Sequence, residues 1–209
     1  MTAPISAAGL RLYGFALSGH SHRVSLFLSL LQLRYEHIEV DLAGGAHKRP
    51  DFLRMNPFGQ VPVLQDGDFT LPDSNAILVY LAKRDGTASW WPDDAVGAGR
   101  VQRWLSVAAG PLAAGPAAAR RWVVFGKQAP DPALVERSHA LLAVMEAALV
   151  ESPFLAGAAP TLADIACYSY TAHAPEGGVS LSGYPHLRAW LARIEALPHF
   201  VAMPASPLP

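Results

Sequence analysis

Cysteine, charge and long apolar runs are all scarce in this chain. One cysteine among 209 residues excludes an internal disulfide framework and fits a reducing compartment. Charged residues make up 16%, the formal net charge is -1 and no basic run occurs, which argues against nucleic-acid or anionic-membrane partners. No apolar run approaches the roughly 20 residues that a membrane-spanning helix requires. Residues 1–12, MTAPISAAGLRL, lack the pattern of a signal peptide, so we expect a soluble, cytoplasmic protein.

The eight histidines show no HExxH or similar metal-ligand spacing, so no metal site is predicted. Hydrophobic residues make up 51% of the chain, enough for a sizeable core in one large domain or two small ones.

The first half of the chain alternates strand and helix patterns. Leu10–Phe15 and Tyr35–Val40 are typical of strands, and apolar residues at helical spacing lie between them, which predicts a right-handed βαβ unit. Gly44–Met55 is polar and predicts a loop with a short helix. A strand at Val61–Gln65, a second short strand and a helix at Ser74–Arg84 then complete a thioredoxin-like order.

The stretch Asn56–Asn75 contains a predicted hairpin turn and a proline that allows two interpretations. Asp66-Gly67 predicts a two-residue type I′ hairpin loop. Pro62 inside a predicted strand favours an edge strand. Alternatively, a cis Val61-Pro62 bond would turn the backbone groups of Val61 outward toward a peptide ligand.

After Gly86 the chain contains no convincing strand. Residues 87–94, with Trp90-Trp91-Pro92, are interpreted as a linker between an α/β domain at 1–86 and an all-helical domain at 95–209. A helix from Asp94 to about Leu112 is expected to be interrupted by glycine-proline pairs. Other predicted helix starts are Asp131-Pro132, a Thr161-x-x-Asp164 capping box and Tyr184-Pro185. The proline-rich tail from Met203 is expected to pack loosely.

In this order and spacing, four motifs resemble those of cytosolic glutathione transferases over nearly the whole chain: Gly45–Lys48 (GAHK), Asn56–Pro62 (NPFGQVP), Asp73-Ser74 and Pro160–Ile165 (PTLADI). Asn56–Pro62 is most similar to plant phi-class and bacterial members, and the resemblance implies a phi/theta-like glutathione site. The resemblance implies an α/β thioredoxin-like N-terminal domain followed by an all-α C-terminal domain. It reverses the preference at Pro62 in favour of the cis form.

The resemblance also implies a site for glutathione as co-substrate. The backbone of Val61, before cis-Pro62, would pair with the cysteinyl unit. Ser74 and its helix N-terminus would receive the γ-glutamyl carboxylate, and Asp73 its ammonium group. Most members carry glutamate at that position, so the carboxylate here is one methylene shorter. Considered in isolation, Asp73 and Ser74 would only cap a helix.

Three further residues complete the implied glutathione site. Lys48 would hold the glycyl carboxylate, with His47 beside it, and Gln60 would also contact the tripeptide. The alternatives are a solvated loop charge for Lys48 and an ordinary turn residue for Gln60.

Catalysis requires a group that favours the glutathione thiolate at the start of the first helix. Ser18 occupies the place of the sulfur-contacting residue in serine-type members, where its hydroxyl would donate to the sulfur. His20 could assist as a cation, and Tyr13 lies near the tyrosine-type position. Tyr13 could equally be a packed strand aromatic, and Ser21 a helix cap.

The segment Ser18–Ser21 also stands where thioredoxin relatives carry Cys-x-x-Cys. Dithiol exchange and cysteine-type chemistry are therefore not expected. Cys167 is interpreted as a small core residue.

The second substrate is expected to be a hydrophobic electrophile in a cleft between the domains. Candidate walls are Ala16, Leu17, Val107, Pro111, Leu112 and Trp122. The resemblance implies a homodimer in which Phe58 acts as an aromatic key, although Phe58 could instead pack within its own loop. We expect glutathione conjugation. The alternatives are a glutathione-dependent isomerase, dehalogenase or peroxidase, or a non-catalytic binding protein.

Overall fold

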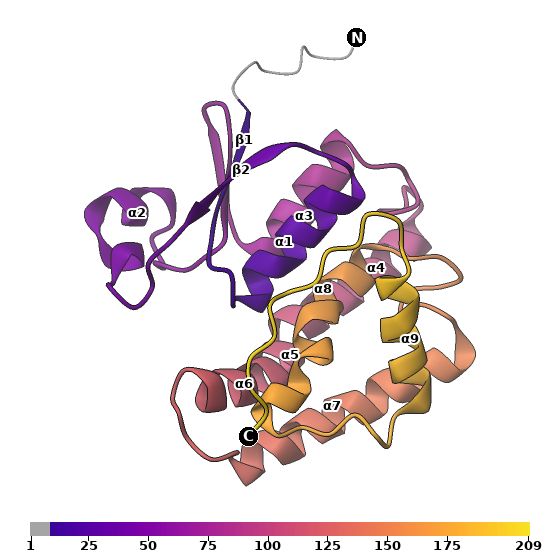
Figure 1. Cartoon of the computed structure of the whole chain (residues 1–209). Helices are drawn as coiled ribbons and strands as arrows, with labels where there is room; N and C mark the ends of the chain where they lie inside the picture. Colours follow the sequence, from indigo (N-terminus) through magenta and orange to yellow (C-terminus); the bar gives the residue numbers. More distant parts are fainter. Residues whose placement is uncertain (1–8) are drawn as a thin grey trace.

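A computed structural model describes residues 9–209 and shows an α/β part beside a helical part (Figure 1). Residues 1–8, which bear on the signal-peptide expectation and begin the predicted domain 1–86, lie outside the described residues. The α/β part contains β1 (Leu10–Gly14), α1 (Gly19–Leu30), β2 (Tyr35–Glu39), η1 (Ala46–Lys48), α2 (Pro50–Met55), β3 (Val63–Asp66), β4 (Phe69–Pro72) and α3 (Ser74–Arg84).

The four strands form one mixed sheet in the order β2-β1-β3-β4. β1 pairs parallel with β2, as a βαβ unit requires, and β3 pairs antiparallel with both β1 and β4. Leu12 and Leu64 lie opposite each other and pack with α1 and α3 in the main core. On the other face, Tyr13 and Val63 pack with Phe52 of α2. Helices therefore cover both faces of the sheet, in a thioredoxin-like domain (Figure 1).

Val61-Pro62 is a cis peptide bond. Pairing of β3 begins at Val63, so both residues precede the ladder, and β3 itself lies between β1 and β4. The edge-strand interpretation of Pro62 is therefore wrong, and the cis form is confirmed.

The hairpin between β3 and β4 differs by one residue from the prediction. Asp66 pairs with Phe69, so the two-residue loop is Gly67-Asp68 rather than Asp66-Gly67. Gly67 has φ +58°, whereas Asp68 is not among the residues with positive φ. A type I′ turn requires positive φ at both central positions, so the type I′ prediction is wrong.

The helical part comprises α4 (Ala95–Ala109), α5 (Pro111–Ala114), α6 (Pro116–Val124), α7 (Pro132–Glu151), α8 (Leu162–Ala172), η2 (Ala174–Gly177) and α9 (Pro185–Glu195). The expected interruptions at Gly110-Pro111 and Gly115-Pro116 divide the first segment into α4, α5 and α6, because proline cannot continue a preceding helix. The predicted helix to about Leu112 therefore ends earlier, at Ala109. Asp131 caps α7 as predicted, by accepting from Ala133 N at 2.8 Å.

Asp164 organises the core of the helical part. The predicted capping box is confirmed, with Asp164 accepting from the backbone N–H of Thr161 at 2.8 Å. The same fully buried carboxylate accepts from Leu155 N and from Trp190 Nε1, both at 2.9 Å. Cys167 on α8 is also fully buried, as predicted, and burial raises the pKa of its thiol to about 12.

The C-terminal tail, residues 199–209, runs back across both parts of the molecule (Figure 1). Ser29 Oγ donates to His199 O at 2.8 Å, and His22 Nε2 lies 2.9 Å from Val201 O. Near the end of the tail, Ser206 N donates to Glu176 Oε1 at 2.9 Å. Met203 is only 4% exposed and Ser206 is half-buried, so the tail is anchored at these two points. The other residues after Met203 are exposed, as expected of a loosely packed tail.

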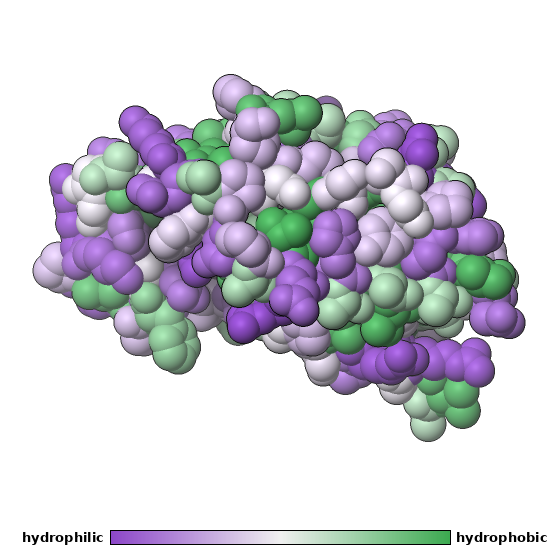
Figure 2. All heavy atoms as spheres, turned by 90° about the horizontal axis from the view of Figure 1, so that it is seen from below, coloured by the Kyte–Doolittle hydropathy of each residue, from purple (hydrophilic) through white to green (hydrophobic). Residues whose placement is uncertain are grey.

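In the described part of the chain, no helix has the length and hydrophobicity to cross a membrane. On the face shown in Figure 2, hydrophobic residues lie in separate small groups among hydrophilic ones.

Candidate functional site

A cavity of about 900 Å³ lies where the thioredoxin-like domain meets the helical part. Among the residues that line it are eight of the nine predicted site residues: Ser18, His20, His47, Lys48, Gln60, Val61, Asp73 and Ser74. The ninth, Pro62, follows Val61 in the chain and is buried. Four segments that are far apart in the sequence therefore converge on one space.

Ser18 lies at the N-terminus of α1, where four backbone N–H groups lack helical partners. It is the N-cap residue, and its Oγ accepts from Ser21 N at 3.3 Å. Among the described residues, no acceptor takes the hydrogen of this hydroxyl, so it can donate into the cavity. Ser21 is not the cap. It is buried, and its Oγ accepts from Phe15 N at 3.2 Å, which fastens the loop before the helix.

His20 is the second residue of α1 and lies beside the start of α3. Its Nδ1 is 3.4 Å from Ser74 Oγ, and its ring meets Tyr170 edge-on with the centroids 5.0 Å apart. Burial, with the charges of Arg23 and Arg121, lowers the pKa of His20 to about 3. A neutral imidazole near pH 7 argues against the suggestion that His20 assists as a cation.

Tyr13 is the third predicted candidate for the sulfur contact. Its hydroxyl donates to Gln65 Oε1 at 3.2 Å, its ring packs in the cluster with α2, and it is not among the residues that line the cavity. The structure favours the packed strand aromatic.

Asp73 and Ser74 begin α3 as predicted. Asp73 is the N-cap residue and accepts from Ala76 N at 2.9 Å. Its backbone has φ +76°, which is uncommon for a residue with a side chain. Such conformations cluster at functional sites, since the surrounding structure must enforce them. The neighbouring Ser74 is only 4% exposed and lies at the cavity wall.

Arg23 is a site residue that sequence reasoning missed as such. The guanidinium is 1% exposed, lines the cavity, and donates from Nη1 to Ser74 Oγ at 3.2 Å and to Asn75 Oδ1 at 2.7 Å. An arginine in the middle of an apolar helix pattern is the only sequence signal for it, because arginine is almost never fully buried unless it is paired.

The opposite end of the site comes from η1 and the turn before the cis-proline. Lys48 Nζ donates to Gly59 O at 3.1 Å, and Gly59 has φ +58°. A Cβ at Gly59 would lie only 2.8 Å from His47 O and Lys48 Nζ, so this close approach requires glycine. His47 Nδ1 is buried and has no hydrogen-bond partner among the described residues. Gln60 is exposed at the cavity.

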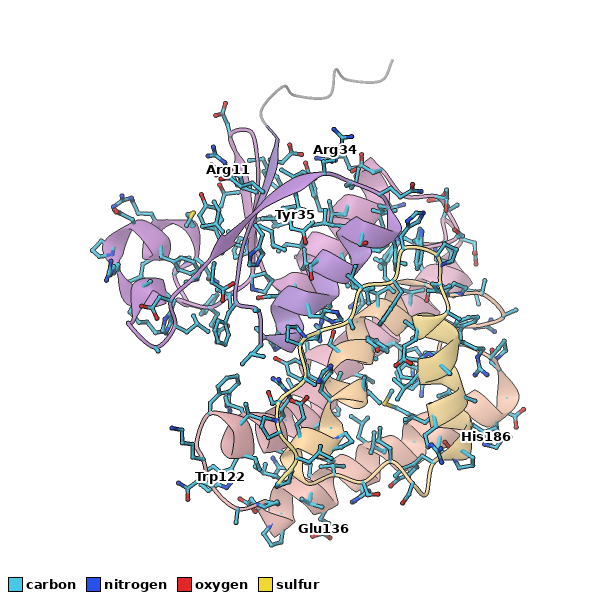
Figure 3. The ribbon with its side chains drawn as sticks, viewed as in Figure 1. Arg11, Arg34, Tyr35, Trp122, Glu136 and His186 are labelled. Atoms are coloured by element: carbon cyan, nitrogen blue, oxygen red, sulfur yellow. The ribbon has the colours of Figure 1, made fainter. Side chains whose placement is uncertain are left out.

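The helical wall differs from the prediction. Of the six predicted wall residues, only Leu17 lines the cavity. Leu112 is fully buried in the core, and Trp122 points to the side of the molecule, where its Nε1 donates to Ala129 O at 3.0 Å (Figure 3). The wall consists instead of Ala109, Ala113, Ala117, Arg120, Arg121, Phe125 and Tyr170.

One residue of this wall, Arg120, belongs to a buried ion pair. Arg120 Nε donates to Glu176 Oε2 at 2.6 Å, and Arg120 Nη1 donates to Leu17 O at 2.7 Å, next to Ser18. Hydrogen bonds from Ser206, His173 and Arg120 lower the pKa of Glu176 against the effect of burial, so the carboxylate stays ionised. The pair thus fixes the loop before α1.

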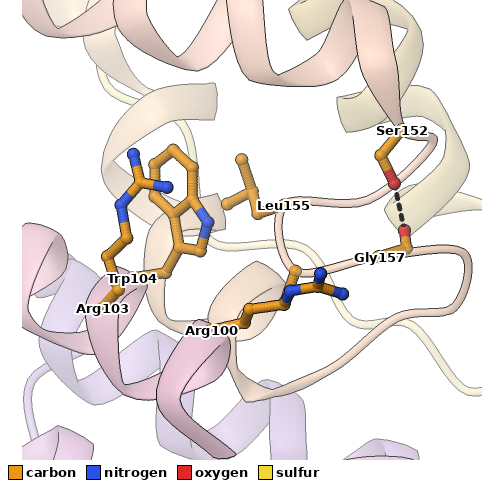
Figure 4. A pocket seen from close by; sticks show the side chains of 7 residues that line it. Arg100, Arg103, Trp104, Ser152, Leu155 and Gly157 are labelled. Carbon is orange, nitrogen blue, oxygen red and sulfur yellow. Dashed lines mark hydrogen bonds between the residues drawn. The ribbon is translucent and has the colours of Figure 1, made fainter. Parts of the chain in front are cut away.

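A second, smaller cavity of about 220 Å³ lies in the helical part and contains none of the predicted site residues (Figure 4). Arg100 and Arg103 on α4 flank Trp104 there, and Ser152 Oγ donates to Gly157 O at 2.6 Å. No group of three or more potential metal-ligating side chains occurs in residues 9–209.

The fold and site define a two-domain protein of the thioredoxin-like class, with a cis-proline loop and two helix N-termini facing a helical domain across a cavity. Two family models match the chain: the glutathione S-transferase N-terminal domain at residues 8–83 and the C-terminal domain at residues 107–198. The chain belongs to the glutathione S-transferase family.

Individual relatives are similar over nearly their full length. Glutathione S-transferase 3 of Zea mays is 39% identical over 217 residues, covering 97% of this chain and 96% of the relative. The crystal structure of a glutathione S-transferase from Pseudomonas fluorescens has a TM-score of 0.89 at 35% identity and covers 94% and 99% of the two chains. A glutathione transferase homolog from Drosophila mojavensis, solved with bound glutathione, has a TM-score of 0.84 at 29% identity and covers 91% and 89%.

Proposed function

We propose that this protein binds glutathione in the 900 Å³ cavity and transfers it to a hydrophobic electrophile. The observation that carries the proposal is the convergence of the predicted residues from four segments on that one cavity. The Drosophila mojavensis homolog with bound glutathione supports the choice of ligand.

The polar groups match the parts of the tripeptide. Ser74, at the N-terminus of α3, would receive the γ-glutamyl carboxylate, and the Asp73 carboxylate would bind the ammonium group. The backbone of Val61, which lies outside the ladder, is available to pair with the cysteinyl unit. Lys48, with His47 and Gln60 nearby, would bind the glycyl carboxylate.

The sulfur would then lie at the N-terminus of α1. There the helix dipole favours an anion, and the Ser18 hydroxyl can donate to a thiolate while its lone pair accepts from Ser21 N. Lowering the thiol pKa by two units requires about 2.7 kcal/mol of preferential stabilisation of the anion. Ser18 need not remove the proton, which can leave to solvent.

The thiolate attacks the electrophilic carbon and forms a carbon–sulfur bond, while a leaving group departs with its electron pair or a double bond accepts the pair. We further propose a cytoplasmic homodimer with a role in detoxification. Phe58 is 79% exposed, which argues against packing within its own loop and supports its use as the aromatic key between subunits. Isomerase, dehalogenase and peroxidase reactions would use the same glutathione site.

Ultraviolet difference absorbance on adding glutathione between pH 5 and 9 tests the mechanism. The wild type should form a bound thiolate at a pH well below the range in which the thiol of free glutathione ionises. Ser18→Ala and Ser18→Gly should lose it, although glycine costs only a few tenths of a kcal/mol as a cap. Ser18→Thr, which keeps a hydroxyl, should retain it.

The other outcomes are equally informative. Loss of the thiolate in His20→Ala alone would transfer the sulfur contact to His20. If the wild type and all variants bind glutathione but none forms a thiolate, the conjugation mechanism is wrong and a non-catalytic binding protein is favoured.

A further inference from the structure

The helical wall of the cavity has a regular composition. Every fourth residue from Ala109 onward lines the cavity: Ala109 ends α4, Ala113 is on α5, Ala117 and Arg121 are on α6, and Phe125 follows α6. Ala117 and Arg121 share one face of α6, and the turns at Gly110 and Gly115 bring Ala109 and Ala113 to the same cavity. Three methyl groups leave room beside this wall, Phe125 adds an aromatic ring, and Arg121 supplies a charge.

Arg121 differs from the other cations of the cavity. Arg120 is paired with Glu176, Arg23 donates to Ser74 and Asn75, and Lys48 donates to Gly59. The Arg121 side chain has no ion pair or hydrogen bond with any residue in the range 9–209, and it is exposed. Its charge nevertheless reaches the glutathione side, because it is one of the causes that lower the pKa of His20.

The charges around the cavity are strongly unbalanced. Among residues 9–209, its lining includes Arg23, Arg120, Arg121 and Lys48 but only one carboxylate, Asp73. In the proposed function, Lys48 binds the glycyl carboxylate of glutathione. Ser74, which accepts a hydrogen bond from Arg23, binds the γ-glutamyl carboxylate. Arg121 remains on the wall that faces the second substrate.

We infer that the electrophile of this protein carries a carboxylate or a comparable anionic group, which Arg121 binds while the apolar body of the substrate rests against the alanines and Phe125. This inference rests on the proposed function and specifies its substrate class. The planar fork of arginine can bind both oxygens of a carboxylate through two parallel N–H···O bonds, a geometry that the single nitrogen of lysine does not provide.

Two matched electrophiles test this inference: 4-chloro-3-nitrobenzoate and its neutral methyl ester. In each, the glutathione thiolate attacks the carbon that carries chlorine, a carbon–sulfur bond forms, and chloride leaves with the electron pair. The two substrates differ in charge at the far end of the ring. The quantity compared between variants is the ratio of kcat/KM for the acid to kcat/KM for the ester, which cancels effects common to both.

Arg121→Gln should lower this ratio about tenfold, the scale of one lost charge-assisted hydrogen bond. Arg121→Lys should lower it less. Arg188→Gln is the matched control, because Arg188 is an exposed arginine on α9, which contributes no residue to the cavity, and the ratio should stay at its wild-type value. An unchanged ratio in Arg121→Gln would overturn the inference, even if both rates fall together, because Arg121 would then act on the sulfur or on the fold.

Calorimetry with the two glutathione conjugates, the acid and the ester, separates failure of this inference from failure of the proposed function. If the wild type forms no bound thiolate and turns over neither electrophile, the proposed function fails. Binding still decides the inference: Arg121→Gln should weaken the acid conjugate about tenfold relative to the ester conjugate. Equal weakening of both, or of neither, would overturn it.

Discussion

Arg23 Nη1 lies 3.2 Å from Ser74 Oγ, so a buried cation on α1 supports the first turn of α3 from behind. The same nitrogen donates to Asn75 Oδ1 at 2.7 Å, whereas Arg23 Nε and Nη2 have no hydrogen-bond partner among the described residues. The guanidinium thereby orients Ser74 and adds positive charge where we place the γ-glutamyl carboxylate.

Arg23→Lys should raise the KM for glutathione about tenfold, because the lysine side chain is one bond shorter and does not carry its nitrogen to the position of Nη1, which holds both Ser74 and Asn75. Steady-state kinetics with glutathione varied measures the change. Arg34→Lys is the control, since Arg34 is exposed and extends away from the body in Figure 3. Equal KM values in the two variants would show that Arg23 serves only the core.

Asp73→Asn separates the capping role of Asp73 from its proposed binding role. Asparagine tolerates positive φ and caps helices as well as aspartate does, so the free energy of unfolding should change by less than about 0.5 kcal/mol. Loss of the carboxylate should weaken glutathione binding about tenfold, because a charge-assisted bond to the ammonium group is lost. Urea unfolding and calorimetric titration measure the two effects.

The control for that experiment is Asp131→Asn, which changes the cap of α7 outside the cavity. It should leave glutathione affinity at the wild-type value. If Asp73→Asn also binds glutathione with wild-type affinity, Asp73 is only a helix cap.

Stability should fall as the pH is lowered from 7 to 5. Burial is the main cause that lowers the pKa of His20 to about 3 and of His22 to about 4, so both stay neutral in the folded protein. In the unfolded chain they take up protons below about pH 6.5. The unfolded state then binds more protons, and the free energy of unfolding should decrease by about 2.5 kcal/mol per pH unit near pH 5.

Urea unfolding at several pH values between 5 and 7 measures this slope. His22→Gln should reduce the slope by roughly half, since one of the two titrating groups is removed. His186→Gln should leave it unchanged, because the His186 side chain is half exposed and labelled at the surface in Figure 3. If the free energy of unfolding of His22→Gln depends on pH as steeply as that of the wild type, His22 does not contribute to the pH dependence.

The sequence predicted the order of strands and helices because periodicity and capping residues are local signals. Asp131 and the Thr161–Asp164 box mark helix starts within a few residues of the groups they bind. The cis isomer of the Val61-Pro62 bond could not be predicted from such local signals. Local chemistry favoured an edge strand, and only the family motif favoured the cis form that the structure has.

The site was predicted well on one side of the cavity and poorly on the other. The α/β residues belong to short motifs, whereas the helical wall depends on how α4, α5 and α6 rotate after each glycine-proline break. Leu112 and Arg121 both fit an amphipathic pattern, but only packing decides that the first is buried and the second faces the cavity.

The C-terminal tail also affects how the protein can be made. Two residues of α1 make hydrogen bonds to the tail: His22 with Val201, 179 residues later, and Ser29 with His199, 170 residues later. A ribosome has therefore synthesised almost the entire chain before the helix that carries the proposed sulfur site acquires these last contacts. The N-terminal domain can begin to fold early, but this part of it is completed only when synthesis ends.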